Sequence, residues 1–279
     1  MDRLEIAPDL WVDARRALWM EHERTLVVAD LHLGYAWAQR RRGALLPLAD
    51  VEDAAARLLA LQQEYRPETL VFLGDLVHGR QLGAPVGASL GDLLGRLAVA
   101  SQLVLTLGNH DGSVPGWIAQ AGLPLRCEPA WRTGAHLLLH GDRDEDARNA
   151  RPTEAADVVV RTLAADVAVR APRERSQSAR PAKPRFGAVG RKEGLVIMGH
   201  EHPMIVLGDD VATGARCPCF LVGEHRLMVP AFSRWAAGVV AGREPFMSEL
   251  ARTSRWHAAV AILGERLLRL PWKRRDCFP

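Results

Sequence analysis

The clearest pattern in the chain is a short apolar run that ends abruptly in polar residues. It occurs five times, in TLVVA (25–29), TLVFL (69–73), QLVLTL (102–107), HLLL (136–139) and LVIM (195–198). Continuous apolar runs of this length, bounded by turn residues, predict strands that are buried on both faces. Each strand therefore leaves its sheet at a point where polar side chains follow it.

Two segments with Leu and Ala at helical spacing separate the first three runs. They cover 48–65, which ends before Pro67, and 87–101. Strand, helix, strand, helix, strand with continuous apolar strands predicts an α/β fold with a parallel sheet covered on both faces. Upstream, residues 10–24 predict two short strands and a turn that lead into the first run.

The second half of the chain has a different composition. Residues 155–169 fit a helix, and 171–192 are rich in Arg, Pro, Ser and Ala with little to bury, which predicts a mobile loop. After residue 215, short apolar stretches alternate with turn residues, and this alternation predicts antiparallel sheet. We expect one domain over 1–279 with a flexible Arg- and Pro-rich insertion at about 143–193.

Composition excludes several classes of protein but identifies no partner. The net charge of +3 is too small to indicate nucleic acid by itself. No apolar run reaches the about 18 residues that a membrane span needs. The start, MDRLEIAPDLWV, lacks the apolar core of a signal peptide. We therefore expect a cytoplasmic protein with no membrane partner.

The cysteines also favour a reducing compartment such as the cytoplasm. Four are present, and they form neither a CxxC pair nor a disulfide framework. Cys217 and Cys219 would share one face of a strand, but we expect reduced thiols ahead of a metal role.

The polar residues that follow the five runs have the chemistry of metal ligands. They are Asp30, His32, Asp75, Asn109, His140, His200 and His202. Strand ends at one edge of an α/β sheet are common ligand sites. Oxygen and imidazole donors without a thiolate suit Mn, Fe, Zn or Ni, and contain too much imidazole for Ca or Mg alone.

The number and spacing of these residues indicate two metal ions. Seven candidates exceed what one tetrahedral ion uses, and they suit two ions about 3.5–4 Å apart. In extended backbone Asp30 and His32 would lie on one side of the chain, and so would His200 and His202.

The order D-x-H, GD, GNHD, H-G, GH-x-H resembles the calcineurin-like metallophosphoesterase superfamily over 28–202. The resemblance implies a four-layer α-β-β-α sandwich with a two-sheet core and a metal site at the carboxyl ends of its strands. It assigns one ion to Asp30, His32 and His202 and the other to Asn109, His140 and His200, with Asp75 as the bridge. It also implies that His110 faces the scissile phosphate, as general acid or as charge stabiliser, with Asp111 orienting it.

The resemblance implies hydrolysis of phosphodiester bonds by metal-activated hydroxide, with two divalent ions. Manganese is the favoured metal, and Fe, Zn and Ni are the alternatives. The chain has GDLVHGR and GNHD where Ser/Thr protein phosphatases have GDxxDRG and GNHE, which argues against a phosphoprotein phosphatase.

A narrower resemblance concerns three stretches of the chain. RTLVVADLHLGYAWAQRRRGALLP, LVFLGDLVHG and CPCFLVGEHRLMVPAFSRWAAG resemble the bacterial DNA-ligase-associated metallophosphoesterases, relatives of double-strand-break repair nucleases. This implies a role in DNA metabolism or repair, with DNA as substrate and DNA ligase and helicase as functional partners.

Two other functions stay open at this stage. One is a phosphodiesterase or phosphatase acting on nucleotides or cyclic nucleotides. The other is a non-catalytic scaffold, which the presence of every candidate ligand opposes. For substrate contact the sequence offers only Arg40, Arg41 and Arg42, which a solvated helix face explains equally well, and His78, which fits a packed turn nearly as well.

Overall fold

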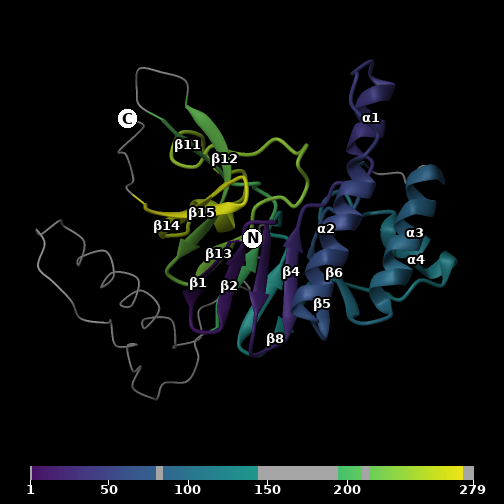
Figure 1. Ribbon diagram of the computed structural model, residues 1–279, viewed down its shortest axis with the longest axis horizontal. Helices are drawn as coiled ribbons and strands as arrows, with labels where there is room; N and C mark the ends of the chain where they lie inside the picture. Colours follow the sequence, from purple (N-terminus) through teal and green to yellow (C-terminus); the bar gives the residue numbers. More distant parts are fainter. Residues whose placement is uncertain (1, 80–83, 144–193, 209–213, 273–279) are drawn as a thin grey trace, which may run out of the picture.

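The computed structural model describes residues 2–79, 84–143, 194–208 and 214–272, and Figure 1 shows its arrangement. Two β-sheets lie face to face, and helices α2, α3 and α4 lie together on the outer side of one of them. The insertion expected at about 143–193, with its predicted helix and loop, falls outside the described residues except for Arg143.

The first sheet has seven strands whose spatial order follows their order in the chain. They are β1 (Arg3–Ala7), β2 (Leu10–Asp13), β3 (Ala17–Met20), β4 (Thr25–Ala29), β5 (Thr69–Leu73), β6 (Gln102–Thr106) and β7 (Leu125–Glu128). Strands β1 to β4 pair antiparallel, whereas β4 to β7 pair parallel. The sheet is therefore mixed, and only its second half is the parallel sheet that the sequence predicts.

Helices connect the parallel strands and cover one face of this sheet. They are α1 (Tyr35–Arg41), α2 (Asp50–Tyr65), α3 (Ala84–Ala98) and α4 (Val114–Ala121). Leu58 and Leu61 of α2 and Leu90 and Leu94 of α3 are fully buried against the sheet, with Phe72 of β5 in the same cluster. The predicted helices are confirmed, although α3 occupies a slightly earlier stretch than the predicted 87–101.

Strand β1 was not predicted from the sequence. Only Ile6 of its five residues is buried, so the strand carries little of the hydrophobic pattern that identifies a strand. The strands expected at 25–29 and 69–73 are confirmed, and the one expected at 102–107 is observed as Gln102–Thr106.

The second sheet is also mixed. Its strands are β8 (Ala130–Thr133), β9 (His136–Leu139), β10 (Val196–Met198), β11 (Met204–Leu207), β12 (Ala215–Gly223), β13 (Arg226–Met228), β14 (Trp256–Leu263) and β15 (Arg266–Pro271). Their order is β15-β14-β12-β13-β10-β9-β8, with β11 paired to β12. The predicted antiparallel pairing holds for β12 to β15, but β10 pairs parallel with both β9 and β13.

The two sheets pack through apolar side chains that point toward each other. Val27, Val71 and Val104 of the first sheet share a buried cluster with Ile197 and Phe220 of the second. This cluster covers the second face of the first sheet and forms the two-sheet core that the resemblance implied.

The outer face of the second sheet has its own cover. Leu250 and Ala251 of the short helix α7 (Glu249–Arg252) pack there with Trp256 and Met198. This gives the four layers expected from the resemblance, with a thin outer layer on this side in the described part of the chain. No helix among the described residues is long and apolar enough to cross a membrane.

A buried ion pair fastens helix α2 to the first sheet. Asp13 is 1% exposed and accepts hydrogen bonds from the backbone and guanidinium of Arg15 and from the Tyr65 hydroxyl at 2.7 Å. Arg15 also lies 2.7 Å from Glu64 of the same helix. Burial raises the pKa of Asp13, but the bonds from Arg15 and Tyr65 outweigh burial and hold that pKa below its usual value.

Asp13→Asn should therefore destabilise the protein. It removes the buried carboxylate partner of Arg15 and leaves that guanidinium only Glu64, whose side chain is 54% exposed, which costs about 3 kcal/mol of unfolding free energy. A carboxyl whose folded pKa is depressed contributes its stability above the unfolded pKa of about 3.9 and loses it as pH falls through the lower folded value. Urea unfolding should thus show the full deficit at pH 7 and a shrinking deficit below about pH 4. A deficit independent of pH would contradict the charged state assigned to Asp13.

Candidate metal centre

The polar side chains that follow β4, β5, β6, β9 and β10 meet at one edge of the sandwich. The first three strands run parallel in one sheet, and the last two run parallel in the other. Backbone hydrogen bonds join the strand ends, from His32 N–H to the Asp75 carbonyl at 2.9 Å and from Gly199 N–H to the His140 carbonyl at 3.1 Å. All seven candidate ligands named from the sequence lie in this region.

One group of ligand atoms forms around Asp30. The side chains of Asp30, His32 and His202 each offer an atom within reach of a common centre. Nε2 of His202 lies 3.5 Å from Oδ1 of Asp30 and 3.1 Å from Nε2 of His32. These are the three residues that the resemblance assigned to one ion.

A second group forms around His140. Its Nε2 lies 3.2 Å from Oδ1 of Asn109 and 3.2 Å from Nδ1 of His200. These are the residues that the resemblance assigned to the other ion. Asp30 also approaches this group, since its Oδ1 lies 3.6 Å from Nδ1 of His140.

Asp75 lies between the two groups. Its Oδ2 is 3.7 Å from Nε2 of His32, and its Oδ1 is 3.6 Å from Nε2 of His140. The backbone N–H of His110 donates to Oδ1 at 2.9 Å and holds the carboxylate in this orientation. One oxygen thus faces each group, which is the arrangement that a bridging carboxylate requires.

Hydrogen bonds to backbone carbonyls fix which histidine nitrogens face the centre. Nδ1 of His202 donates to the Ala237 carbonyl at 2.6 Å, and Nδ1 of His140 donates to the Leu73 carbonyl at 3.1 Å. Because a carbonyl only accepts, each neutral ring carries its proton on Nδ1 and presents a lone pair at Nε2. Such second hydrogen bonds are typical of metal-binding histidines.

An unpaired atom and the charges of the centre fit divalent cations. Oδ1 of Asp30, which faces His202, is buried and has no hydrogen-bond partner. Burial and the charge of Asp30 raise the pKa of Asp75 to about 8. Burial lowers the pKa of His202, but the Asp30 carboxylate outweighs it and raises that pKa to about 9. The centre therefore gathers protons at two ligand positions, where positive charge is needed and where cations would replace them.

The backbone at the ligands is left-handed rather than extended. Asp30, His32, Asp75, His200 and His202 all have φ between 47° and 72°. The expected extended backbone was therefore wrong, although Asp30 and His32 do lie in one group as predicted. The same-side placement of His200 and His202 was wrong, because His200 faces His140 whereas His202 faces Asp30. Non-glycine residues in this region are strained, and such strain is common at functional sites.

Glycines make room for the ligands. A Cβ on Gly108 would lie 2.4 Å from Oδ1 of Asp75, and a Cβ on Gly74 would lie 2.2 Å from Nδ1 of His140. Each of these glycines directly precedes a candidate ligand. Asp75 from the adjacent strand β5 occupies the space beside Gly108, and His140 from β9 of the other sheet occupies the space beside Gly74. The glycines of the GD and GNHD motifs are therefore required by the close packing of strand ends, and the residues that follow them supply the ligand chemistry.

His110 lies beside Asp75 and next to the first group. Its Nε2 is 3.8 Å from Oδ2 of Asp75, and its Nδ1 accepts the N–H of Gly79 at 3.3 Å. The ring stacks on His78 with centroids 5.5 Å apart, and Tyr35 packs edge-on against His78 at 4.7 Å. The His78 ring thus packs against one face of the His110 ring and restricts its orientation.

Asp111 does not act on His110 in the way expected. Its two oxygens accept backbone N–H groups, from Leu76 at 2.9 Å and from Gly108 at 3.0 Å. The side chain is fully buried and ties the loop after β5 to the loop after β6. The His110 ring is instead oriented by Gly79 and His78.

The remaining sequence candidates contribute less to the centre. Arg40, Arg41 and Arg42 are exposed at the end of α1. Of these, Arg42 lies close enough to His78 to help lower the pKa of that ring, after burial and His110. Cys127, Cys217 and Cys219 are free, and Cys277 lies outside the described residues.

Sequence reasoning did not identify Glu201, which has a supporting role. It is 1% exposed, and its two oxygens accept the N–H groups of Met247 and Ser248 at 2.8 and 2.7 Å. Its place inside GHEH was a usable signal, but its partners lie 46 and 47 residues away in the chain.

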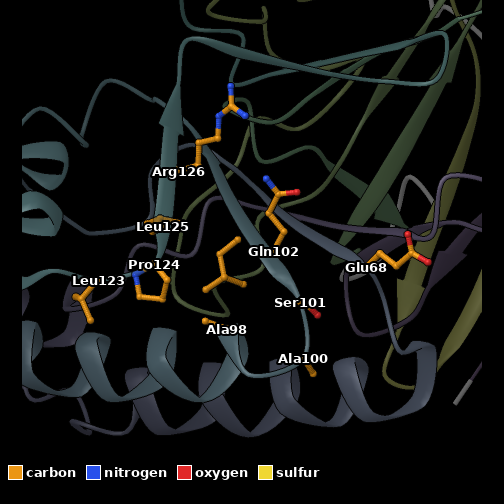
Figure 2. A pocket seen from close by; sticks show the side chains of 10 residues that line it. Glu68, Ala98, Ala100, Ser101, Gln102, Leu123, Pro124, Leu125 and Arg126 are labelled. Atoms are coloured by element: carbon orange, nitrogen blue, oxygen red, sulfur yellow. The ribbon is translucent and has the colours of Figure 1, made fainter.

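A separate cavity of about 700 Å³ lies at the opposite edge of the first sheet (Figure 2). It is lined by the end of α3 and the amino ends of β6 and β7, with Glu68, Gln102 and Arg126 as its polar side chains. Ser101 at its base already hydrogen-bonds the Pro67 carbonyl and Gln62. The groups of candidate metal ligands in the described part of the chain lie at the other edge.

Gly108→Ala tests the packing of the centre. The new methyl group would displace Asp75, so we expect metal affinity to fall about tenfold or more, as it does when other groups that support metal ligands are disturbed. Calorimetric titration with Mn²⁺ measures this. Gly95→Ala on α3 is the matched control, because nothing lies within 4 Å of its Cβ position. Unchanged affinity in Gly108→Ala would show that Asp75 does not hold the metal.

Comparison with known proteins agrees with this geometry. The model of the calcineurin-like phosphoesterase family matches residues 23–204, a range that contains every candidate ligand. A search of curated proteins found no match. Among solved structures, the fold is similar to that of Pseudomonas putida nuclease MPE, with a TM-score of 0.60 and 23% identity over 96% of this chain and 99% of that one. Yfce, a phosphoesterase from E. coli, matches with a TM-score of 0.37 and 14% identity over 88% of this chain and 98% of that one. The chain belongs to the calcineurin-like phosphoesterase family.

Proposed function

We propose that this protein is a dinuclear-metal phosphodiesterase that hydrolyses phosphodiester bonds in DNA, with Mn²⁺ as its favoured metal. The observation that carries the proposal is the position of Asp75, one oxygen of which faces Asp30's group of ligands while the other faces His140's group. Two cations held there would polarise the phosphoryl group and lower the pKa of bound water. The protein's own residues must then hold the phosphate and stabilise the charge that develops on it.

The His110 ring lies where it can stabilise the charge that develops on the phosphoryl group. Because Gly79 donates its N–H to Nδ1, that nitrogen carries no proton, and the neutral ring has its N–H at Nε2. Nε2 points toward the space beside Asp75. Burial and the nearby His202 also hold the pKa of His110 below its usual value. A neutral imidazole is a good hydrogen-bond donor but a weak acid, so the geometry favours charge stabilisation over proton transfer.

DNA is favoured as the substrate on two grounds. The similar structure from Pseudomonas putida is that of a nuclease. In addition, three stretches of this chain resemble the DNA-ligase-associated metallophosphoesterases, which supports a role in DNA repair in the cytoplasm, alongside a ligase and a helicase.

A panel of substrates with Mn²⁺ tests the proposal. It contains single-stranded DNA, duplex ends, cyclic nucleotides, and bis-nitrophenyl phosphate beside its monoester. We expect hydrolysis of the diesters and of DNA, abolished by chelation and in Asp75→Asn. Cleavage of cyclic nucleotides without cleavage of DNA would replace the proposal with a small-molecule phosphodiesterase. Hydrolysis of none of them would indicate a non-catalytic scaffold.

His110→Ala tests the assigned role of that ring. Removing a donor that stabilises developing charge should lower kcat about 10²–10³-fold, with similar losses on an alkyl diester and on bis-nitrophenyl phosphate. A general acid would matter far more for the alkyl diester, because its leaving alkoxide needs the proton. His22→Ala is the control, since that side chain is 69% exposed and lies outside the centre. A much larger loss on the alkyl diester would assign His110 to proton transfer.

A further inference from the structure

A cavity lined by arginines opens near the metal centre. Its volume is about 520 Å³, and it lies where the β2–β3 turn, the start of β12 and the β14–β15 turn meet. Its basic side chains are Arg15, Arg16, Arg57, Arg216 and Arg234. We call it the arginine cavity.

Strand register places the arginine cavity on the same edge of the sandwich as the metal centre. In the antiparallel pair β3–β4, Leu18 lies opposite Val27, so Arg16 is level with the end of β4, just before Asp30. Strand β12 runs antiparallel to β13, which is parallel to β10. Arg216, at the start of β12, therefore lies on the edge where β10 ends and the GHEH motif begins.

One segment of chain separates the cavity from the metal centre. On one side, the N–H of Phe232 donates to the Ala29 carbonyl at 2.7 Å, and that of Ser233 donates to the Asp30 carbonyl at 3.2 Å. On the other side, Arg57 donates to the Phe232 carbonyl at 2.8 Å, and Arg16 donates to the Ser233 carbonyl. The same two residues thus contact the backbone at a candidate metal ligand and the guanidinium groups of the cavity.

The positive charge of the cavity is only partly compensated. Arg15 is paired with Asp13 and Glu64. Arg57 and Arg234 share the single carboxylate of Asp53, at 2.9 and 3.3 Å.

The cavity therefore gathers guanidinium groups that repel one another. Burial, and then the charges of Arg57 and Arg234, lower the pKa of Arg16 to about 10. Arg216 has no ion pair among the described residues, and Glu265 is the one carboxylate in the described lining. Arginines held close together against their mutual repulsion, at the mouth of a cavity, are arranged to receive an anion.

We propose that the arginine cavity binds a backbone phosphate of a single-stranded nucleic acid whose scissile phosphate lies at the metal centre. This rests on the proposed function and deepens it, because it makes the substrate a polynucleotide rather than a single nucleotide. Guanidinium forks match phosphate oxygens, and Phe232 and Ser233 contact both the backbone at Asp30 and the guanidinium groups of the cavity. The cavity is recessed between two sheets, so a flexible single strand reaches it more readily than the rigid backbone of a duplex.

The double variant Arg216→Gln/Arg234→Gln tests the inference. Both side chains are exposed at the cavity, and neither holds the 231–233 segment in place. Fluorescence anisotropy with a 20-nucleotide phosphorothioate single strand and Mn²⁺ measures binding without cleavage. We expect Kd to rise about tenfold or more, and the slope of log K against log salt to fall by about 0.7, because the cavity neutralises one phosphate and each neutralised phosphate of a single strand contributes about 0.7.

Arg96→Gln/Arg255→Gln is the matched control. It removes the same charge from two exposed side chains at the opposite edge of the sandwich, 57% and 83% exposed. The control should bind the strand with nearly the wild-type salt dependence. Equal effects in the two double variants would reduce the result to net charge and overturn the inference, as would wild-type binding in Arg216→Gln/Arg234→Gln.

The test separates this inference from the proposed function. The Kd is measured without turnover, so the binding result is valid whether or not the protein cuts the strand. Failure of the wild-type protein to hydrolyse any phosphodiester would remove the proposed activity while leaving the anisotropy result intact. Failure of the wild-type protein to bind the strand, with hydrolysis of the small diester retained, would overturn the inference alone.

Discussion

The carboxylates of Asp30 and Asp75 lie almost out of contact with solvent between the ends of strands from two sheets, 0% and 2% exposed. Two negative charges buried this close together destabilise each other unless positive charge lies between them. The surrounding histidines can carry positive charge or bind cations there. His140 and His202 donate their Nδ1 protons to backbone carbonyls, so the Nε2 lone pairs face inward. The chemistry available to this protein follows from that electrostatic requirement.

The sandwich holds these groups in place at the expense of local backbone strain. Five candidate ligands have left-handed backbone, and neither Gly74 nor Gly108 has room for a side chain, because His140 from the other sheet and Asp75 from the adjacent strand fill the space. The apolar cluster between the sheets, with Val71, Ile197 and Phe220 at its centre, offsets that strain. Because both sheets contribute ligands, the packing between them determines the geometry of the centre directly.

The segment from Ala231 to Val239 links several parts of this edge. Its peptide groups hydrogen-bond Ala29, Asp30 and Glu201, and the Ala237 carbonyl orients His202. Its outer side is held by Arg16 and Arg57. The segment that borders the arginine cavity is therefore the same one that orients the candidate ligand His202.

The sequence by itself determined the kind of fold and the kind of site. Runs of apolar residues ending in Asp, His or Asn identified the five strands whose ends form the candidate centre, the edge where they meet and the candidate ligand types, because burial and ligand chemistry are properties of single residues and their neighbours in the chain. It could not show that Asp111 binds backbone amides, that His200 and His202 face different partners, or that Glu201 holds residues 247 and 248. Nor could it bring together the arginines of the cavity, whose numbers run from 15 to 234. Those arrangements depend on which strands pair and how two sheets meet, and only the tertiary structure decides them, because the distances involved are set by packing between segments far apart in the chain.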